Sequence, residues 1–125
     1  MTRLLLDTHV FMWWIKADHR ITRAWLEAIL NETNTVHVSA VTAWEIETKK
    51  HIKKLKFDYS VASVAAKAGF EHLSITMDHA ALAGALEWEH RDPFDRMLVA
   101  QAVANDMTLV TSDRAIKSAP GIRVL

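Results

Sequence analysis

The segment HRDPFDRMLVAQA, residues 90–102, places two aspartates at the start of a predicted helix. Asp92 precedes Pro93, which is favoured at the first helical position, so the Asp92 side chain can cap the helix. Asp95 falls in the first turn, where an acid suits the helix dipole and can complete a box-like arrangement with the capping residue. Capping accounts for both aspartates unless the fold brings other acids to the same place.

Further acids follow strand-like segments at positions where ligands commonly bind. Asp7 directly follows RLLL, and Asp113 follows TLV after two hydroxyl residues. Glu45 lies in SAVTAWEIETK, on a predicted helix that begins near Ser39 at the end of a strand. Ligands of an open parallel sheet bind beyond the carboxyl ends of its strands. The predicted helix Pro93–Asn105 would begin at the same edge if it runs antiparallel to the strands, and its first turn holds Asp95. We therefore expect four carboxylates to face one pocket.

Such a cluster of acids predicts a metal site. Two unit charges about 4 Å apart repel by about 4 kcal/mol at an effective dielectric near 20, so the cluster needs protons or cations at neutral pH. Carboxylate oxygens in a chain without cysteine favour hard ions, Mg²⁺ or Mn²⁺. The chemistry that fits is hydrolysis of a phosphate ester by a metal-activated water.

Each acid also has a purely structural interpretation. Asp7 could cap the helix that starts at the next residue, and Asp113 could cap the short turn DRAIK. Glu45 could pair with Lys49 one turn later on an exposed helix face. The apolar neighbours of Glu45 argue against an exposed face at that position. Asp92 is interpreted as a cap.

Short apolar runs alternate with longer helical patterns along the chain. The predicted strands are Arg3–Leu6, Val36–Ser39, Glu71–Ser74, Thr108–Val110 and Arg123–Leu125. The predicted helices are Thr8–Lys16, Arg23–Asn31, Val41–His51, Tyr59–Ala68, Asp78–Glu89 and Pro93–Asn105. This alternation predicts an α/β fold with a parallel or mostly parallel sheet covered by helices.

Length and composition favour one domain spanning residues 1–125. The formal net charge is zero, so any contact with nucleic acid must be local rather than spread over a basic surface. The absence of cysteine excludes disulfides and thiolate metal sites. The sequence has neither a signal-peptide core nor a membrane span, and we expect a cytoplasmic protein.

One stretch of the chain is strongly basic, and the chain is also rich in tryptophan. KKHIKKLK contains Lys49, Lys50, Lys53, Lys54 and Lys56, and it fits either the solvated end of a helix or a surface that contacts RNA phosphates. The five tryptophans are interpreted as core or dimer-interface residues rather than base-stacking ones.

Because Trp13 and Trp14 are adjacent, we expect at least one of them to face a partner. The seven histidines show no metal-ligand spacing that competes with the acids. His9 could approach the site from its position near Asp7.

Four motifs in this order, LLLDTHVFMWW, SAVTAWEIETK, RDPFDRMLVAQA and LVTSD, resemble the PIN-domain nucleases, and specifically the VapC toxins of bacterial VapBC toxin–antitoxin modules. The resemblance implies a three-layer α/β/α sandwich with a mostly parallel five-stranded sheet. It also implies a Mg²⁺- or Mn²⁺-dependent endoribonuclease that acts on RNA, is inhibited by a small VapB-like antitoxin and commonly forms a homodimer.

Carried over position by position, the resemblance assigns the family's metal-binding acids to Asp7, Glu45, Asp95 and Asp113. Thr111 matches the hydroxyl residue of the family's Thr-x-Asp pattern, and Thr8 follows the first acid; both could orient carboxylates. Arg96 matches the last letter of the family's DPFDR stretch.

Two other kinds of protein remain as alternatives. A receiver-like signalling module has a similar length and a parallel sheet, but it needs paired acids after its first strand, and here Thr8 follows Asp7. A catalytically idle interaction module would use the same acids only to hold a structural metal ion.

Overall fold

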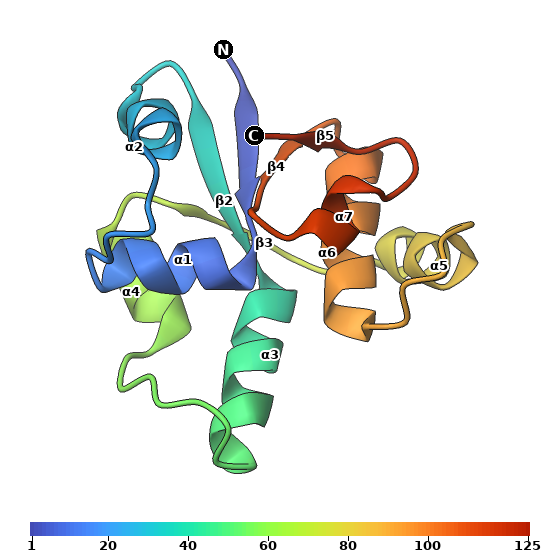
Figure 1. The fold of residues 1–125 in the computed structure, drawn as a ribbon, viewed down its shortest axis with the longest axis horizontal. Helices are drawn as coiled ribbons and strands as arrows, with labels where there is room; N and C mark the ends of the chain where they lie inside the picture. The colour runs from blue at the N-terminus through green and yellow to red at the C-terminus, as the bar shows by residue number, and fades with distance from the viewer.

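Five parallel strands form the sheet of the computed structural model, which describes residues 1–125 (Figure 1). Their order across the sheet is β3-β2-β1-β4-β5, and every neighbouring pair is parallel. The strands are β1 (Arg3–Leu6), β2 (Thr35–Ser39), β3 (Glu71–Leu73), β4 (Thr108–Val110) and β5 (Arg123–Val124). The predicted sheet is confirmed, and it is parallel throughout.

Helices cover both faces of this sheet. They are α1 (Thr8–Ile15), α2 (Arg23–Leu30), α3 (Ala40–His51), α4 (Val61–Lys67), α5 (Met77–Ala85), α6 (Pro93–Ala104) and α7 (Arg114–Lys117). In Figure 1, α1, α2 and α4 lie to the left of the sheet, and α5, α6 and α7 lie to its right. Helix α3 continues from the end of β2 and extends past the edge of the sheet.

The side chains of β1 show why two helical layers are needed. Successive side chains of a strand face opposite sides of the sheet. Leu4 and Leu6 belong to an apolar cluster with residues of α1, α2 and α4, whereas Leu5 belongs to a second cluster with residues of α6 and α7. Helix α3 reaches both clusters, through Ile46 and Val41 respectively. The predicted three-layer α/β/α sandwich is therefore confirmed.

A topological switch point lies between β1 and β4, because the chain builds β2 and β3 on one side of β1 and β4 and β5 on the other. Leu6 pairs with Val110 at this point, and the N–H of Asp7 donates to the Val110 carbonyl at 3.1 Å. Helix α6 crosses back over the sheet before β4 and so begins at the same edge. Open α/β sheets bind ligands at this kind of edge.

A buried polar contact holds α3 beside α6. The Ser39 hydroxyl caps α3 by accepting from the N–H of Val41 at 3.0 Å. The same hydroxyl donates to the side-chain oxygen of Gln101 on α6 at 2.5 Å, and both residues are buried. This contact fixes the spacing between the helices that carry Glu45 and Asp95.

The main disagreement with the predicted elements concerns α5. That helix ends at Ala85 rather than at Glu89, because backbone carbonyls around its end are bound by the distant Arg96 side chain, as described below. Helix α4 starts at Val61 rather than Tyr59, since Ser60 caps it by accepting from the N–H of Ser63 at 3.3 Å. No helix has the length and apolar character that crossing a membrane requires.

The two adjacent tryptophans both pack against one core, contrary to the premise that they could not, and part of each remains exposed. Trp13 stacks on Trp25 with ring centroids 6.2 Å apart, and Trp14 lies 6.2 Å from the Phe70 ring. Both pack against the same apolar cluster because α1 lies along several of its members. Trp44 is different, since 55% of it is exposed.

Candidate metal centre

Asp7 lies at the switch point and has two roles. It caps α1 by accepting from the N–H of Val10 at 2.9 Å, as the capping interpretation predicts. Its other oxygen accepts from the Thr111 hydroxyl at the end of β4. Only 3% of Asp7 is exposed, and this burial raises the pKa of its carboxyl group against the opposing effect of the Thr111 and Val10 hydrogen bonds.

Asp113 is joined to Asp7 through Thr111. The N–H of Asp113 donates to the Thr111 hydroxyl at 3.0 Å, and that hydroxyl in turn donates to Asp7. The Asp113 carboxylate caps α7 by accepting from the N–H of Ala115 at 2.9 Å, so the predicted cap is confirmed. Unlike Asp7, Asp113 is exposed and lies at the rim of the group.

Glu45 combines the two interpretations that the sequence offered. It is buried, with 3% of the residue exposed, as its apolar neighbours indicate. It also pairs with Lys49, whose Nζ lies 2.5 Å from Glu45 Oε2. The second Glu45 oxygen has no hydrogen-bond partner in the protein. Lys49 is used in this ion pair.

Asp95 lies in the first turn of α6, and several groups set its ionisation. Burial raises the pKa of Asp95 to about 6; the His90 hydrogen bond opposes this shift, and the negative charges of Asp92 and Glu45 add to it. Helices α3 and α6 pack against each other and so bring these two acids toward the same region. The aromatic rings of Trp44 and Phe94, one residue before each acid, pack 4.7 Å apart at 72°.

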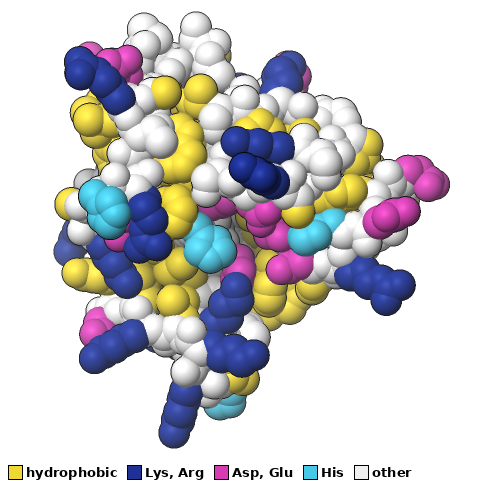
Figure 2. Space-filling model, viewed as in Figure 1, with side chains coloured by type: hydrophobic (Ala, Val, Ile, Leu, Met, Phe, Trp, Pro, Cys, Tyr) yellow, Lys and Arg dark blue, Asp and Glu magenta, His cyan; other side chains and the backbone are white.

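The acids gather on one face of the molecule. Figure 2 shows acidic side chains near the centre of this face, over the region where α1, α3 and α6 meet in Figure 1, with Lys and Arg side chains above and below them. Histidines lie on either side of the acidic group in the same view.

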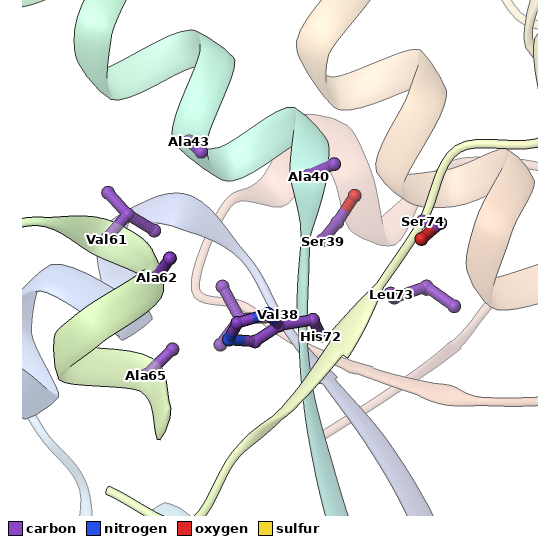
Figure 3. A pocket seen from close by; sticks show the side chains of 10 residues that line it. All are labelled: Val38, Ser39, Ala40, Ala43, Val61, Ala62, Ala65, His72, Leu73 and Ser74. Atoms are coloured by element: carbon purple, nitrogen blue, oxygen red, sulfur yellow. The ribbon is translucent and has the colours of Figure 1, made fainter. Parts of the chain in front are cut away.

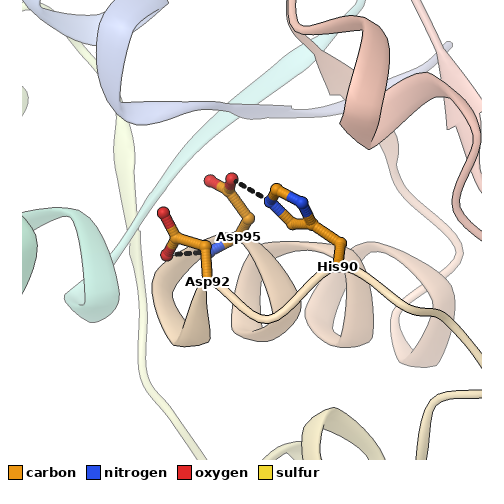
Figure 4. A group of neighbouring side chains, drawn as sticks. All are labelled: His90, Asp92 and Asp95. Atoms are coloured by element: carbon orange, nitrogen blue, oxygen red, sulfur yellow. Dashed lines mark hydrogen bonds and ion pairs between the residues drawn. The ribbon is translucent and has the colours of Figure 1, made fainter.

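Asp92 caps α6, as predicted, by accepting from the N–H groups of Phe94 at 2.9 Å and Asp95 at 3.3 Å. The box-like arrangement proposed for Asp95 is wrong. Its carboxylate instead contacts Nε2 of His90 at 2.8 Å (Figure 4).

His90 is the residue that sequence reasoning missed. Ligand atoms of His90, Asp92 and Asp95 all lie within 4.8 Å of one another, although the histidines show no metal-ligand spacing in the sequence that competes with the acids. The only sequence signal was its place in HRDPFDR, just before the helix. His9 is exposed on α1, two residues after Asp7, and its interaction with Asp7 lowers the pKa of that carboxyl group.

Thr8 differs from its expected role. Its hydroxyl forms a buried hydrogen bond of 3.2 Å with the hydroxyl of Thr42 on α3, rather than contacting a carboxylate. It therefore ties the start of α1 to α3, while Thr111 makes the contact with Asp7.

The donor set fits a divalent cation. Glu45 and Asp95 each have one carboxylate oxygen that accepts no hydrogen bond from the protein. No buried side-chain oxygen or nitrogen in the protein lacks a partner, so these two free oxygens reach solvent at the acidic group. Asp7 and Glu45 are deeply buried and Asp95 has a raised pKa, so a hard cation would offset their charge. The structure brings His90, Asp92 and Asp95 within 4.8 Å of one another, and Asp7, Glu45 and Asp113 lie outside that group.

A separate hollow of about 250 Å³ lies between α3, α4 and the β2–β3 edge of the sheet (Figure 3). Its walls are mostly apolar and include Val38, Ala43, Val61, Ala65 and Leu73. No carboxylate lines it, so it is distinct from the acidic group.

Comparison with known proteins gives consistent matches over nearly the whole chain. The family model of the PIN domain matches residues 4–122. Ribonuclease VapC22 of Mycobacterium tuberculosis is 32% identical over 122 residues, which cover 94% of this chain and 92% of that protein.

Two solved structures share the fold. VapBC2 from Rickettsia felis, bound to a DNA fragment from its promoter, has a TM-score of 0.73 at 19% identity and covers 99% of this chain and 98% of its own. DNA-bound VapBC from Salmonella typhimurium has a TM-score of 0.72 at 23% identity, with coverage of 100% and 98%.

Proposed function

The chain belongs to the PIN-domain family, and we propose that it is a VapC-like toxin, an endoribonuclease that hydrolyses RNA phosphodiester bonds with Mg²⁺ or Mn²⁺. The observation that carries the proposal is the joining of Asp7 to Asp113 through one threonine at the switch point. Helices α3 and α6, which carry Glu45 and Asp95, pack against each other. The similarity to a ribonuclease over 94% of the chain supports RNA as the substrate.

We assign the metal-binding oxygens to Asp7, Glu45, Asp95 and Asp113. A bound Mg²⁺ or Mn²⁺ would lower the pKa of a water molecule and offset negative charge on the phosphate. Neighbouring groups of the protein hold three of these carboxylates in different ways.

The protein fixes three of these acids before any ligand binds. Asp7 is held through both oxygens, by Val10 and Thr111, so its carboxylate cannot rotate freely. Lys49 holds one oxygen of Glu45 and His90 holds one oxygen of Asp95, leaving the other oxygen of each available. Asp113 is exposed at the rim, where it can meet an incoming polynucleotide. Preorganised donors of this kind avoid reorganisation when the substrate binds.

We further propose that a small VapB-like antitoxin inhibits the enzyme and that the protein forms a homodimer. The solved VapBC complexes with the same fold support an antitoxin partner. The exposed Trp44 on α3 is a candidate for burial in either interface.

The test is cleavage of total cellular RNA by the purified protein with Mg²⁺, with Mn²⁺ and with EDTA. The variant is Asp95→Asn, and Asp58→Asn, at an exposed position in the loop before α4, is the matched control. We expect discrete cleavage that requires metal and is lost only in Asp95→Asn. Full activity of Asp95→Asn would overturn the proposal.

The same preparation separates the enzyme from a catalytically idle module. A structural site predicts that Mn²⁺ raises the melting temperature without RNA cleavage under any condition. The enzyme predicts both effects together.

A further inference from the structure

The Arg96 side chain is bound entirely by backbone carbonyl groups. Its five N–H donors form a fixed planar fork, and all three of its nitrogens are used. The acceptors are the carbonyls of Ala83 at 2.9 Å, Trp88 at 2.7 Å, His90 at 3.0 Å, Leu86 at 2.9 Å and Gly84 at 3.4 Å. The segment between α5 and α6 is thus wrapped around one guanidinium group.

This arrangement explains how an irregular segment keeps one conformation. The last carbonyls of a helix lack partners within the helix, and residues 86–92 form no helix or strand of their own. Arg96 satisfies the carbonyls at the end of α5 and then those of the segment that follows. A lysine has the charge but not the fork, so it cannot bind the same set of carbonyls.

The wrapped segment presents His90 to the metal centre. Arg96 holds the His90 carbonyl, and the Trp88 ring lies against the His90 imidazole with centroids 4.7 Å apart at 32°. His90 Nε2 lies 2.8 Å from Asp95 Oδ2. The imidazole and both nearby carboxylates point away from α6 on the same side (Figure 4).

We propose that His90 is a positioning residue for Asp95 and that Arg96 acts on the metal centre through His90. The inference rests on the proposed function, since it concerns how that site holds its ion. An N–H on Nε2 that donates to one Asp95 oxygen stops the carboxylate from rotating, and it leaves the other oxygen available to a metal ion. Partners of this kind, one step removed from the metal, usually change its affinity by about 10- to 100-fold.

The first experiment compares His90→Phe with His90→Gln in the full chain. Phenylalanine keeps a ring against Trp88 but has no donor, whereas the glutamine amide places a donor near the position of Nε2. We expect His90→Phe to weaken Mn²⁺ binding, measured by calorimetry, at least about tenfold. The kcat for RNA cleavage should fall with KM for RNA unchanged, and His90→Gln should recover most of both losses. His19→Phe, at a side chain that is 93% exposed, is the control.

The second experiment tests the link to Arg96. We expect Arg96→Lys to speed hydrogen exchange in residues 86–92 and to weaken Mn²⁺ binding. If Arg96 acts through His90, adding Arg96→Lys to His90→Phe should cause little further loss of Mn²⁺ affinity. Additive losses would overturn the role of Arg96.

Two outcomes would overturn the role of His90. Wild-type Mn²⁺ affinity in His90→Phe would mean that the contact with Asp95 only packs the segment. Equal losses in His90→Phe and His90→Gln would mean that a side-chain donor is not what the site requires. In both cases the wild-type protein still binds Mn²⁺ and cleaves RNA; failure of the wild type to do either would instead refute the proposed function.

Discussion

Thr111 and Asp7 are 104 residues apart in the sequence, and the Thr111 hydroxyl donates a hydrogen bond to the Asp7 carboxylate. The contact spans the switch point between β4 and β1, and the same hydroxyl accepts from the N–H of Asp113 at 3.0 Å. One buried hydroxyl therefore sets the position of two candidate metal ligands.

We predict that Thr111→Val destabilises the protein by about 1–3 kcal/mol, because it leaves an oxygen of the buried Asp7 without its partner. The valine keeps the shape of the side chain, so packing contributes little to the effect. Urea denaturation measures the change, and Thr111→Ser, which keeps the hydroxyl, is the control. Equal stability of the wild type and Thr111→Val would show that water replaces the hydroxyl without cost.

Asp95→Asn should stabilise the protein when divalent ions are removed. Burial and the charges of Asp92 and Glu45 all disfavour the ionised form of Asp95 at neutral pH. After discounting for partial exposure, we expect a gain of about 1 kcal/mol, or about 3–6 °C in Tm, in the presence of EDTA. A lower Tm for Asp95→Asn would mean that the negative charge at the start of α6 is worth more to the helix than its repulsion costs.

The ionisation of Asp95 also predicts how the stability of the metal-free protein depends on pH. The pKa of Asp95 is about 6 in the folded state, against an ordinary value of 3.8. The stability contributed by protonated Asp95 is therefore fully present below about pH 4 and is lost as the pH rises through 6. Asp7, whose pKa is also raised by burial, acts in the same direction.

The measurement is Tm between pH 4 and pH 8 in EDTA for the wild type and Asp95→Asn. We expect the Tm of the wild type to fall more steeply between pH 5 and pH 7, because the asparagine cannot ionise. Parallel curves for the two proteins would contradict a raised pKa at Asp95.

The elements that bear the acids could be predicted because their signals are local. Strands β1 and β4 are short apolar runs followed by capping residues, and their predicted bounds agree with the structure. The placement of Asp7, Asp95 and Asp113 at one edge then follows from the parallel sheet, since the carboxyl ends of its strands share that edge.

The segment between α5 and α6 could not be predicted, because a distant side chain determines its shape. Helical periodicity continued to Glu89, but Arg96 binds carbonyls from Ala83 to His90 and the helix stops at Ala85. The contact between His90 and Asp95 depends on that same wrapping. No spacing rule within HRDPFDR indicates it.

The last prediction concerns the basic stretch after Glu45. Lys49 pairs with Glu45 and Lys50 with Glu47, whereas Lys53, Lys54 and Lys56 are exposed and form no ion pair. If this end of α3 and the following loop contact RNA phosphates, the binding lysines are the last three. This narrows the candidate surface from five lysines to three.

We expect the triple substitution of Lys53, Lys54 and Lys56 by glutamine to weaken RNA binding. Each lost phosphate contact on a single strand should reduce the slope of log affinity against log salt by about 0.7, so the slope should fall by up to about 2. Fluorescence anisotropy with an inactive Asp95→Asn background measures binding without cleavage. Lys67→Gln, at the exposed end of α4, is the control and should leave the slope unchanged. A lysine that contacts a phosphate releases counterions and so contributes to the slope. An unchanged slope in the triple variant would mean that these three lysines do not contact RNA and are only the solvated end of α3 and its loop.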